Sequence, residues 1–161
     1  MPDQSLTDEK LKARVIEQAF KGDFIGARRI VGGIVDRGHL SKAWRAILYI
    51  QRDHQDVQGV KETIVSCPDH SLLYGHEYRE LPLRFAKAGN VIGAIEIAKT
   101  MGPWGRFSLM MILYALVYKG DLAGAREAVS HIDDEAVRSW SLKIVDELQR
   151  NGTSPEEPSQ H

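Results

Sequence analysis

The chain has 161 residues, of which 43% are hydrophobic and 27% charged, and a formal net charge of −1 at pH 7. This length supports one domain with a substantial core, so neither a disulfide nor a metal is needed to explain folding. The near-zero charge excludes a bulk attraction to polyanions, and the single cysteine, Cys67, excludes an internal disulfide framework and fits a reducing compartment.

The sequence predicts neither a secretory signal nor a membrane span. The segment from Met1 to Ser5 has no positively charged region followed by an apolar one. The most apolar stretch, 107–118, has roughly a dozen residues, whereas a membrane-spanning helix needs about 20. We therefore expect this stretch to be a buried helix and the protein to be cytoplasmic.

The predicted elements are all helices. Leu11, Val15 and Ala19 share one face of the first segment, and an apolar stripe from Val137 to Leu148 marks the last one. No long run of alternating β-branched residues predicts a strand. In chain order, we expect helices at 7–21, 23–37, 41–53, 56–65, 71–88, 91–101, 105–119, 122–131 and 134–149.

Proline positions predict the loops, and polar composition predicts disordered ends. Cys67-Pro68 and Gly102-Pro103 indicate loops, because proline disfavours helix at the residue before it. Residues 1–6 are expected to be disordered, as is the polar tail 151–161, which has no apolar anchor. The predicted helical-repeat domain is therefore 7–150.

A short pattern recurs four times, beginning at positions 22, 55, 89 and 120. Each copy reads Gly or Gln, Asp or Asn, two other residues, Gly, and Ala or Val. The second glycines are 33, 34 and 31 residues apart, a period typical of helix-pair solenoids. The pattern predicts an all-α solenoid of about four antiparallel helix pairs plus a C-terminal capping helix.

The residue types in this pattern predict a helix–turn–helix connection. The first Gly can adopt a positive φ and end a helix, and the Asp or Asn can cap the next one. The second Gly costs about 1 kcal/mol relative to Ala inside a helix. We expect close packing of two helices to offset that cost.

The repeated turn resembles that of tetratricopeptide repeats, in which a Gly precedes a small residue of the second helix by five positions. The matching pairs are Gly22/Ala27, Gly89/Ala94 and Gly120/Ala125. The resemblance covers about 7–150, and pentatricopeptide-like arrays, which share this turn, are the close alternative. It implies a right-handed solenoid whose first helices line a concave groove for a peptide or protein partner.

Family geometry implies which positions face that groove, a basic set from the first half and an aromatic and Met set from the second. The predicted partner-binding residues are Lys12, Lys42, Arg45, Tyr49, Arg52, His76, Arg79, Met110, Tyr114 and Tyr118. Because Arg binds carboxylates by two parallel contacts, an acidic peptide with an apolar anchor suits such a groove. The alternative is that the cations are solvated surface and that Tyr114 and Tyr118 belong to the core.

Charge is distributed unevenly along the chain. Residues 10–52 contain ten Lys or Arg and three Asp or Glu, whereas residues 120–161 contain four and nine. This asymmetry favours self-association or the steering of an acidic partner, and chance asymmetry of a solvated surface explains it equally well. The basic stretch 28–52 also leaves RNA binding open, although the acidic second half and the few repeats argue against it.

No catalytic, metal or cofactor site is predicted. The cluster His54, Cys67, Asp69, His70 and His76 does not form the two spaced ligand pairs typical of zinc sites. The chain contains no Gly-x-Ser-x-Gly motif, and its loop at 102–105 lacks the Gly-Lys-Ser/Thr arrangement of a phosphate-binding loop. We expect a non-enzymatic scaffold without cofactors.

Overall fold

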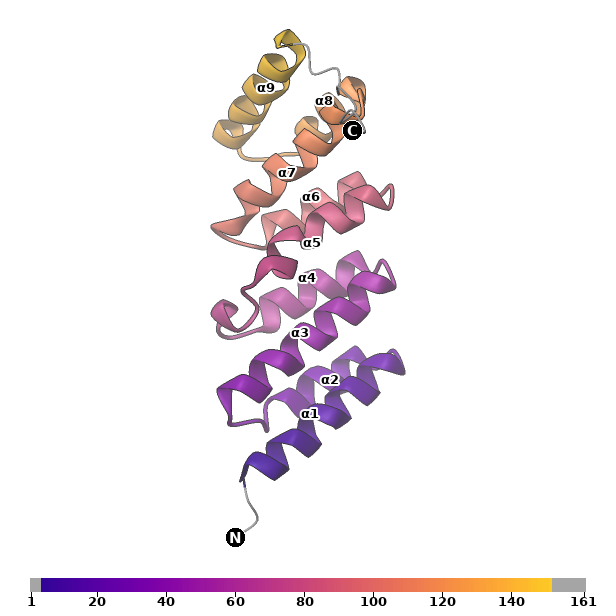
Figure 1. Cartoon of the computed structure of the whole chain (residues 1–161), viewed down its shortest axis with the longest axis vertical. Coiled ribbons are helices and arrows are strands. Elements are labelled where there is room, and N and C mark those ends of the chain that lie inside the picture. Colours follow the sequence, from indigo (N-terminus) through magenta and orange to yellow (C-terminus); the bar gives the residue numbers. More distant parts are fainter. Residues whose placement is uncertain (1–3, 152–161) are drawn as a thin grey trace, which may run out of the picture. The chain divides into compact units, whose positions relative to one another are not determined.

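The computed structural model describes residues 4–151, and over this range the chain is helical, without strands (Figure 1). The elements are α1 Gln4–Phe20, α2 Phe24–Val31, α3 Arg37–Asp53, α4 Val57–Ser66, the 3₁₀ helix η1 His70–Leu72, α5 His76–Lys87, α6 Val91–Lys99, α7 Trp104–Tyr118, α8 Leu122–Ser130 and α9 Glu135–Arg150. The predicted all-α class is confirmed. Within 4–151, no helix combines the length and the apolar character needed to cross a membrane.

The chain packs as two compact units, Met1–Arg79 and Glu80–His161, with the boundary inside α5. In the first unit, α1 packs on α2 and α3, and α3 packs on α4. In the second unit, α6 packs on α7 and α8, and α9 packs on α7 and α8. Each unit is therefore built from helices that pack on their neighbours in sequence.

The four repeated turns have the predicted backbone geometry. The first residue has a positive φ in every copy: +81° at Gly22, +55° at Gln55, +92° at Gly89 and +77° at Gly120. The Asp or Asn that follows caps the next helix, since its side-chain oxygen accepts a hydrogen bond from the N–H of the second glycine over 2.7–2.9 Å. The interpretation of the pattern as a helix end followed by a cap is confirmed.

The atoms nearest to three of the second glycines belong mainly to the capping side chains. A Cβ atom on Gly26 would overlap the carboxylate of Asp23, and one on Gly124 would overlap that of Asp121. At Gly59 the added atom would meet its own capping carboxylate and lie 2.7 Å from Nε2 of Gln51. At these positions glycine leaves room for the capping side chain, while the close packing of two helices stays a prediction.

Two helix boundaries differ from the prediction, because the sequence analysis did not identify Asp36 and Asp69 as N-terminal caps. The predicted helix 23–37 ends at Val31, and α3 begins at Arg37 because Asp36 accepts from the N–H of His39 over 2.8 Å. The predicted helix 71–88 divides into η1, which Asp69 caps, and α5, which begins at His76. α5 also contains Pro82, which cannot donate a backbone hydrogen bond.

The two predicted disordered ends are described only in part. α1 begins at Gln4, so residues 4–6 are helical and the prediction of disorder is wrong for them. In the tail, Asn151 is the C-terminal cap residue of α9, where its N–H donates to the carbonyl of Glu147 over 3.0 Å. Residues 1–3 and 152–161 lie outside the described residues.

Asp8 connects α1 to the loop before α3. Its side chain is fully buried, and its Oδ2 atom accepts from the N–H groups of Val35 over 3.2 Å and Asp36 over 2.7 Å. Gln4 donates to the other carboxylate oxygen over 3.0 Å. One side chain thus satisfies two backbone groups of a loop that lies 27 and 28 residues further along the chain.

The Asp8 carboxylate should make stability depend on pH. The hydrogen bond from Asp36 is the main reason why its pKa lies below the ordinary 3.8. With a lowered folded pKa, the stabilisation is complete well above pH 3.8 and is lost as the pH falls through the folded pKa. We expect Asp8→Asn to lower the urea midpoint near neutral pH, by a difference from wild type that shrinks in acid. The exposed Glu9→Gln is the control, and a pH-independent difference would contradict the prediction.

Candidate partner-binding surfaces

A cleft of about 340 Å³ lies on the first unit and contains four of the predicted residues. We call it the basic cleft; it is lined by Lys42, Arg45, Ala46, Tyr49, Gly75, His76 and Glu77. The α3 residues follow the spacing i, i+3, i+4 and i+7, which places them on one face of that helix. The opposite wall is the start of α5, so the cleft brings together residues more than 25 positions apart in the chain.

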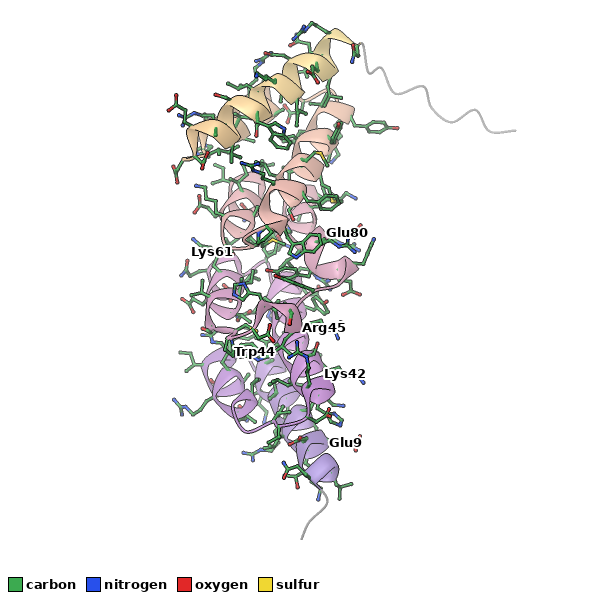
Figure 2. The ribbon with its side chains drawn as sticks, turned by 90° about the vertical axis from the view of Figure 1, so that its left-hand side faces the viewer. Glu9, Lys42, Trp44, Arg45, Lys61 and Glu80 are labelled. Carbon is green, nitrogen blue, oxygen red and sulfur yellow. The ribbon has the colours of Figure 1, made fainter. Side chains whose placement is uncertain are left out.

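Two cations of the basic cleft have no carboxylate partner among residues 4–151. Lys42 is exposed and Arg45 is half-buried, and both lie on α3 (Figure 2). Gly75 leaves space beside the guanidinium: a Cβ atom added there would still be 3.8 Å from Nη1 of Arg45. Both positive charges are therefore available to an external anion.

Tyr49 forms the apolar side of the basic cleft. Burial raises the pKa of its phenol, the nearby Glu77 carboxylate adds to this effect, and the cations Arg45 and Arg52 oppose it. The Arg52 guanidinium stacks 5.0 Å from the centre of the Tyr49 ring and lies 3.7 Å from the Glu77 carboxylate. Arg52 thus holds the aromatic wall in place, while its charge is already paired.

Three predicted basic residues, Lys12, Arg52 and Arg79, do not line the cleft. Lys12 is half-buried on α1, and Arg79 is half-buried on α5. Of the basic residues predicted to face the groove, Lys42 and Arg45 line the cleft, together with His76.

The second unit has a different surface, which we call the tyrosine pocket. It has a volume of about 400 Å³ and is lined by Leu83, Lys87, Tyr114, Ala115, Val117, Tyr118, Lys119 and Leu148. Tyr114 and Tyr118 are 46% and 58% exposed, so they do not belong to the core. Met110, the third residue predicted for this surface, is half-buried and does not line the pocket.

Lys119 and Leu148 are among the residues of the tyrosine pocket that the sequence did not indicate. Lys119 is the C-terminal cap residue of α7, and Leu148 arrives from the last turns of α9. Neither Lys87 nor Lys119 has an ion-pair partner within 4–151. The pocket therefore offers an apolar and aromatic surface with two cations on its rim.

Two kinds of reactive site can be examined directly, clusters of metal-binding side chains and the thiol of Cys67. Within 4–151, no three His, Cys, Asp or Glu side chains lie close enough together to hold a metal ion. Cys67 is buried, its thiol donates to the carbonyl of Asp69 over 3.3 Å, and burial raises the pKa of the thiol. A protonated, buried thiol is a poor nucleophile.

Comparison of the chain with models of protein families, with curated proteins and with solved structures finds no match. The resemblance to tetratricopeptide repeats therefore stays a prediction based on the repeated turn. Inferences about function depend on the two surfaces described above.

Proposed function

We propose that this protein is a non-catalytic cytoplasmic scaffold with tetratricopeptide-like helix pairs in a right-handed solenoid, and that it binds an acidic peptide or partner helix. The observation that carries the proposal is the basic cleft, in which Lys42 and Arg45 stand together without a carboxylate partner among residues 4–151. Cations placed on one helix face beside the half-buried ring of Tyr49 suit a carboxylate followed by an apolar group.

Charge alone would give weak binding. Each exposed ion pair contributes only about 0.2–1 kcal/mol. A partner of useful affinity therefore needs an apolar anchor as well, because aromatic contacts dominate most interfaces. Within the basic cleft, Ala46 and the half-buried Tyr49 supply apolar and aromatic surface for such an anchor.

Charge reversal in the cleft tests this function. We expect Lys42→Glu combined with Arg45→Glu to weaken binding of fluorescent peptides that contain paired glutamates and a phenylalanine by at least about tenfold, because attraction becomes repulsion. Fluorescence anisotropy measures the affinity. Lys10→Glu combined with Arg14→Glu is the matched control, since it reverses the same charge on exposed positions of α1.

The control separates a local effect from a general one. Equal loss in both double variants would show that only net charge matters and would contradict a site in the cleft, as would unchanged binding in the cleft variant. Peptides with Gln in place of Glu should bind weakly to all three proteins. A labelled single-stranded RNA that bound the wild type more tightly than any acidic peptide would favour the alternative function instead.

A further inference from the structure

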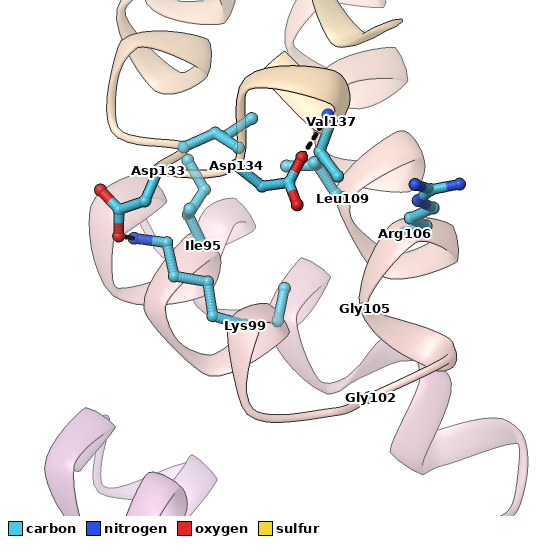
Figure 3. A pocket seen from close by; sticks show the side chains of 11 residues that line it. Ile95, Lys99, Gly102, Gly105, Arg106, Leu109, Asp133, Asp134 and Val137 are labelled. Carbon is cyan, nitrogen blue, oxygen red and sulfur yellow. Dashed lines mark hydrogen bonds and ion pairs between the residues drawn. The ribbon is translucent and has the colours of Figure 1, made fainter.

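A third pocket, of about 430 Å³, lies in the second unit and shares no residue with the tyrosine pocket (Figure 3). Its floor is apolar and comes from α6, α7, the loop before α9 and the first turn of α9. The floor residues are Ile95, Ala98, Leu109, Ile132 and Val137. A few hundred Å³ with an apolar lining and a small number of polar groups is typical of small-molecule sites.

Two glycines give this pocket a wall made of backbone. Gly105, in the first turn of α7, lies against α6 so closely that a Cβ atom would overlap the carbonyl oxygen of Ala98. Gly102 has a φ of +57° and turns the chain between the two helices. Because neither residue has a side chain, the pocket stays open where the two helices meet.

Most charges around the pocket are already paired. Lys99 donates to Asp133 over 3.0 Å and to Glu96 over 2.9 Å. Asp134 accepts from the N–H of Val137 over 2.9 Å, as the N-terminal cap of α9. Both carboxylates on the pocket rim are therefore engaged.

Arg106 is the exception among the charged residues that line the pocket. It is exposed and has no hydrogen-bond or ion-pair partner for its guanidinium within 4–151. Figure 3 shows it on the opposite side of the pocket from the Lys99–Asp133 pair. The rim thus carries one uncompensated positive charge beside an apolar floor, in the first turn of α7, where the helix dipole adds a positive potential.

We propose that this pocket binds a small apolar group that carries a carboxylate. The apolar part contacts Leu109 and Ile132, and the carboxylate pairs with the Arg106 guanidinium, whose planar fork fits two carboxylate oxygens. A free carboxylic acid and the C-terminal residue of a peptide present the same chemistry. The proposal goes beyond the scaffold function, because it involves no residue of the basic cleft.

Titration of the isotope-labelled full chain, followed by NMR, tests the proposal. The probes are phenylacetate, for a free acid, and N-acetylphenylalanine, for a peptide C-terminus, each compared with its primary amide. We expect at least one carboxylate to bind about tenfold more tightly than its amide, since charge-assisted hydrogen bonds are the stronger ones. The carboxylate that binds more tightly shows whether the ligand is a free acid or the C-terminal residue of a peptide.

Variants of the pocket residues test whether the probe binds in the pocket. Arg106→Gln should weaken the carboxylate about tenfold and leave the amide unchanged, and Val137→Phe, which fills the floor, should weaken both. Arg84→Gln, an exposed arginine of the same unit outside the pocket, is the control and should bind as the wild type does, as should Lys42→Glu combined with Arg45→Glu. No binding of either carboxylate, equal binding of acid and amide, or unchanged affinity in Arg106→Gln would overturn the proposal.

Discussion

Replacing Gly105 by Ala should destabilise the second unit by about 1–3 kcal/mol, the usual cost of forcing extra volume into a packed site. The new methyl group would overlap the carbonyl oxygen of Ala98, and a backbone atom cannot move aside as the end of a long side chain can. α6 and α7 must therefore separate. Urea unfolding followed by circular dichroism measures the change, which should appear as a lower midpoint.

The control is Gly32→Ala. Gly32 has a helical φ of −58°, and a Cβ atom there would make ordinary contact, 3.5 Å from the carbonyl oxygen of Arg29. At such a site Ala is neutral or stabilises by about 0.4–1 kcal/mol, because it restricts the unfolded chain. A Gly105→Ala protein as stable as the wild type would show that α6 and α7 do not meet as described.

Thr63→Val should cost about 1–3 kcal/mol, the range for leaving a buried polar group without a partner. The Thr63 hydroxyl donates to Oε1 of Gln51 over 2.8 Å and accepts from Nη1 of Arg28 over 3.0 Å. Both Thr63 and Gln51 are fully buried, and Nε2 of Gln51 already has no partner among the described residues. Valine would leave the whole amide of Gln51 unsatisfied.

The double variant Gln51→Leu with Thr63→Val tests the mechanism. It removes both polar partners and replaces them by apolar groups, which can be nearly neutral. We expect it to be more stable than Thr63→Val alone in the same urea experiment. Thr100→Val, whose hydroxyl bonds only within its own helix end, should cost less. Additive losses from Gln51→Leu and Thr63→Val would mean that the two side chains do not depend on each other.

The turns were predictable because each one is encoded locally. The Gly or Gln, the capping Asp or Asn and the second Gly lie within five residues, so their geometry follows from neighbours in the chain. The number and order of the helices followed from these turns and from apolar periodicity. The surroundings of the second glycine were not predicted, because its sequence position does not reveal that the capping carboxylate lies beside it.

Features that depend on distant residues could not be predicted. Asp8 fixes a loop almost thirty positions away, and α3 begins at Arg37 because Asp36 both caps it and donates its N–H to Asp8. The hydrogen bonds of Asp8 join residues 27 and 28 positions apart, so no local pattern in the sequence reveals them.

The candidate sites likewise contain some residues that the sequence could place together and others that only the fold brings together. Lys42, Arg45 and Tyr49 share a helix face, so spacing alone places them together. Gly75 and Lys87 come from other elements than the residues they accompany, and only the fold brings them to those surfaces. The sequence did not predict the pocket beside Arg106, because the Gly102-Pro103 segment indicates only a turn.

The local closure of the four repeated turns has a consequence for how the chain folds. In the first turn, the N–H of Asp23 donates to the carbonyl of Gln18, and the matching bonds at Asp56, Asn90 and Asp121 also reach back five residues. Chains dominated by contacts between near neighbours have low contact order and reach the native state quickly. Each hairpin can therefore nucleate early on its own, and the rate-limiting step of refolding should be the docking of preformed hairpins.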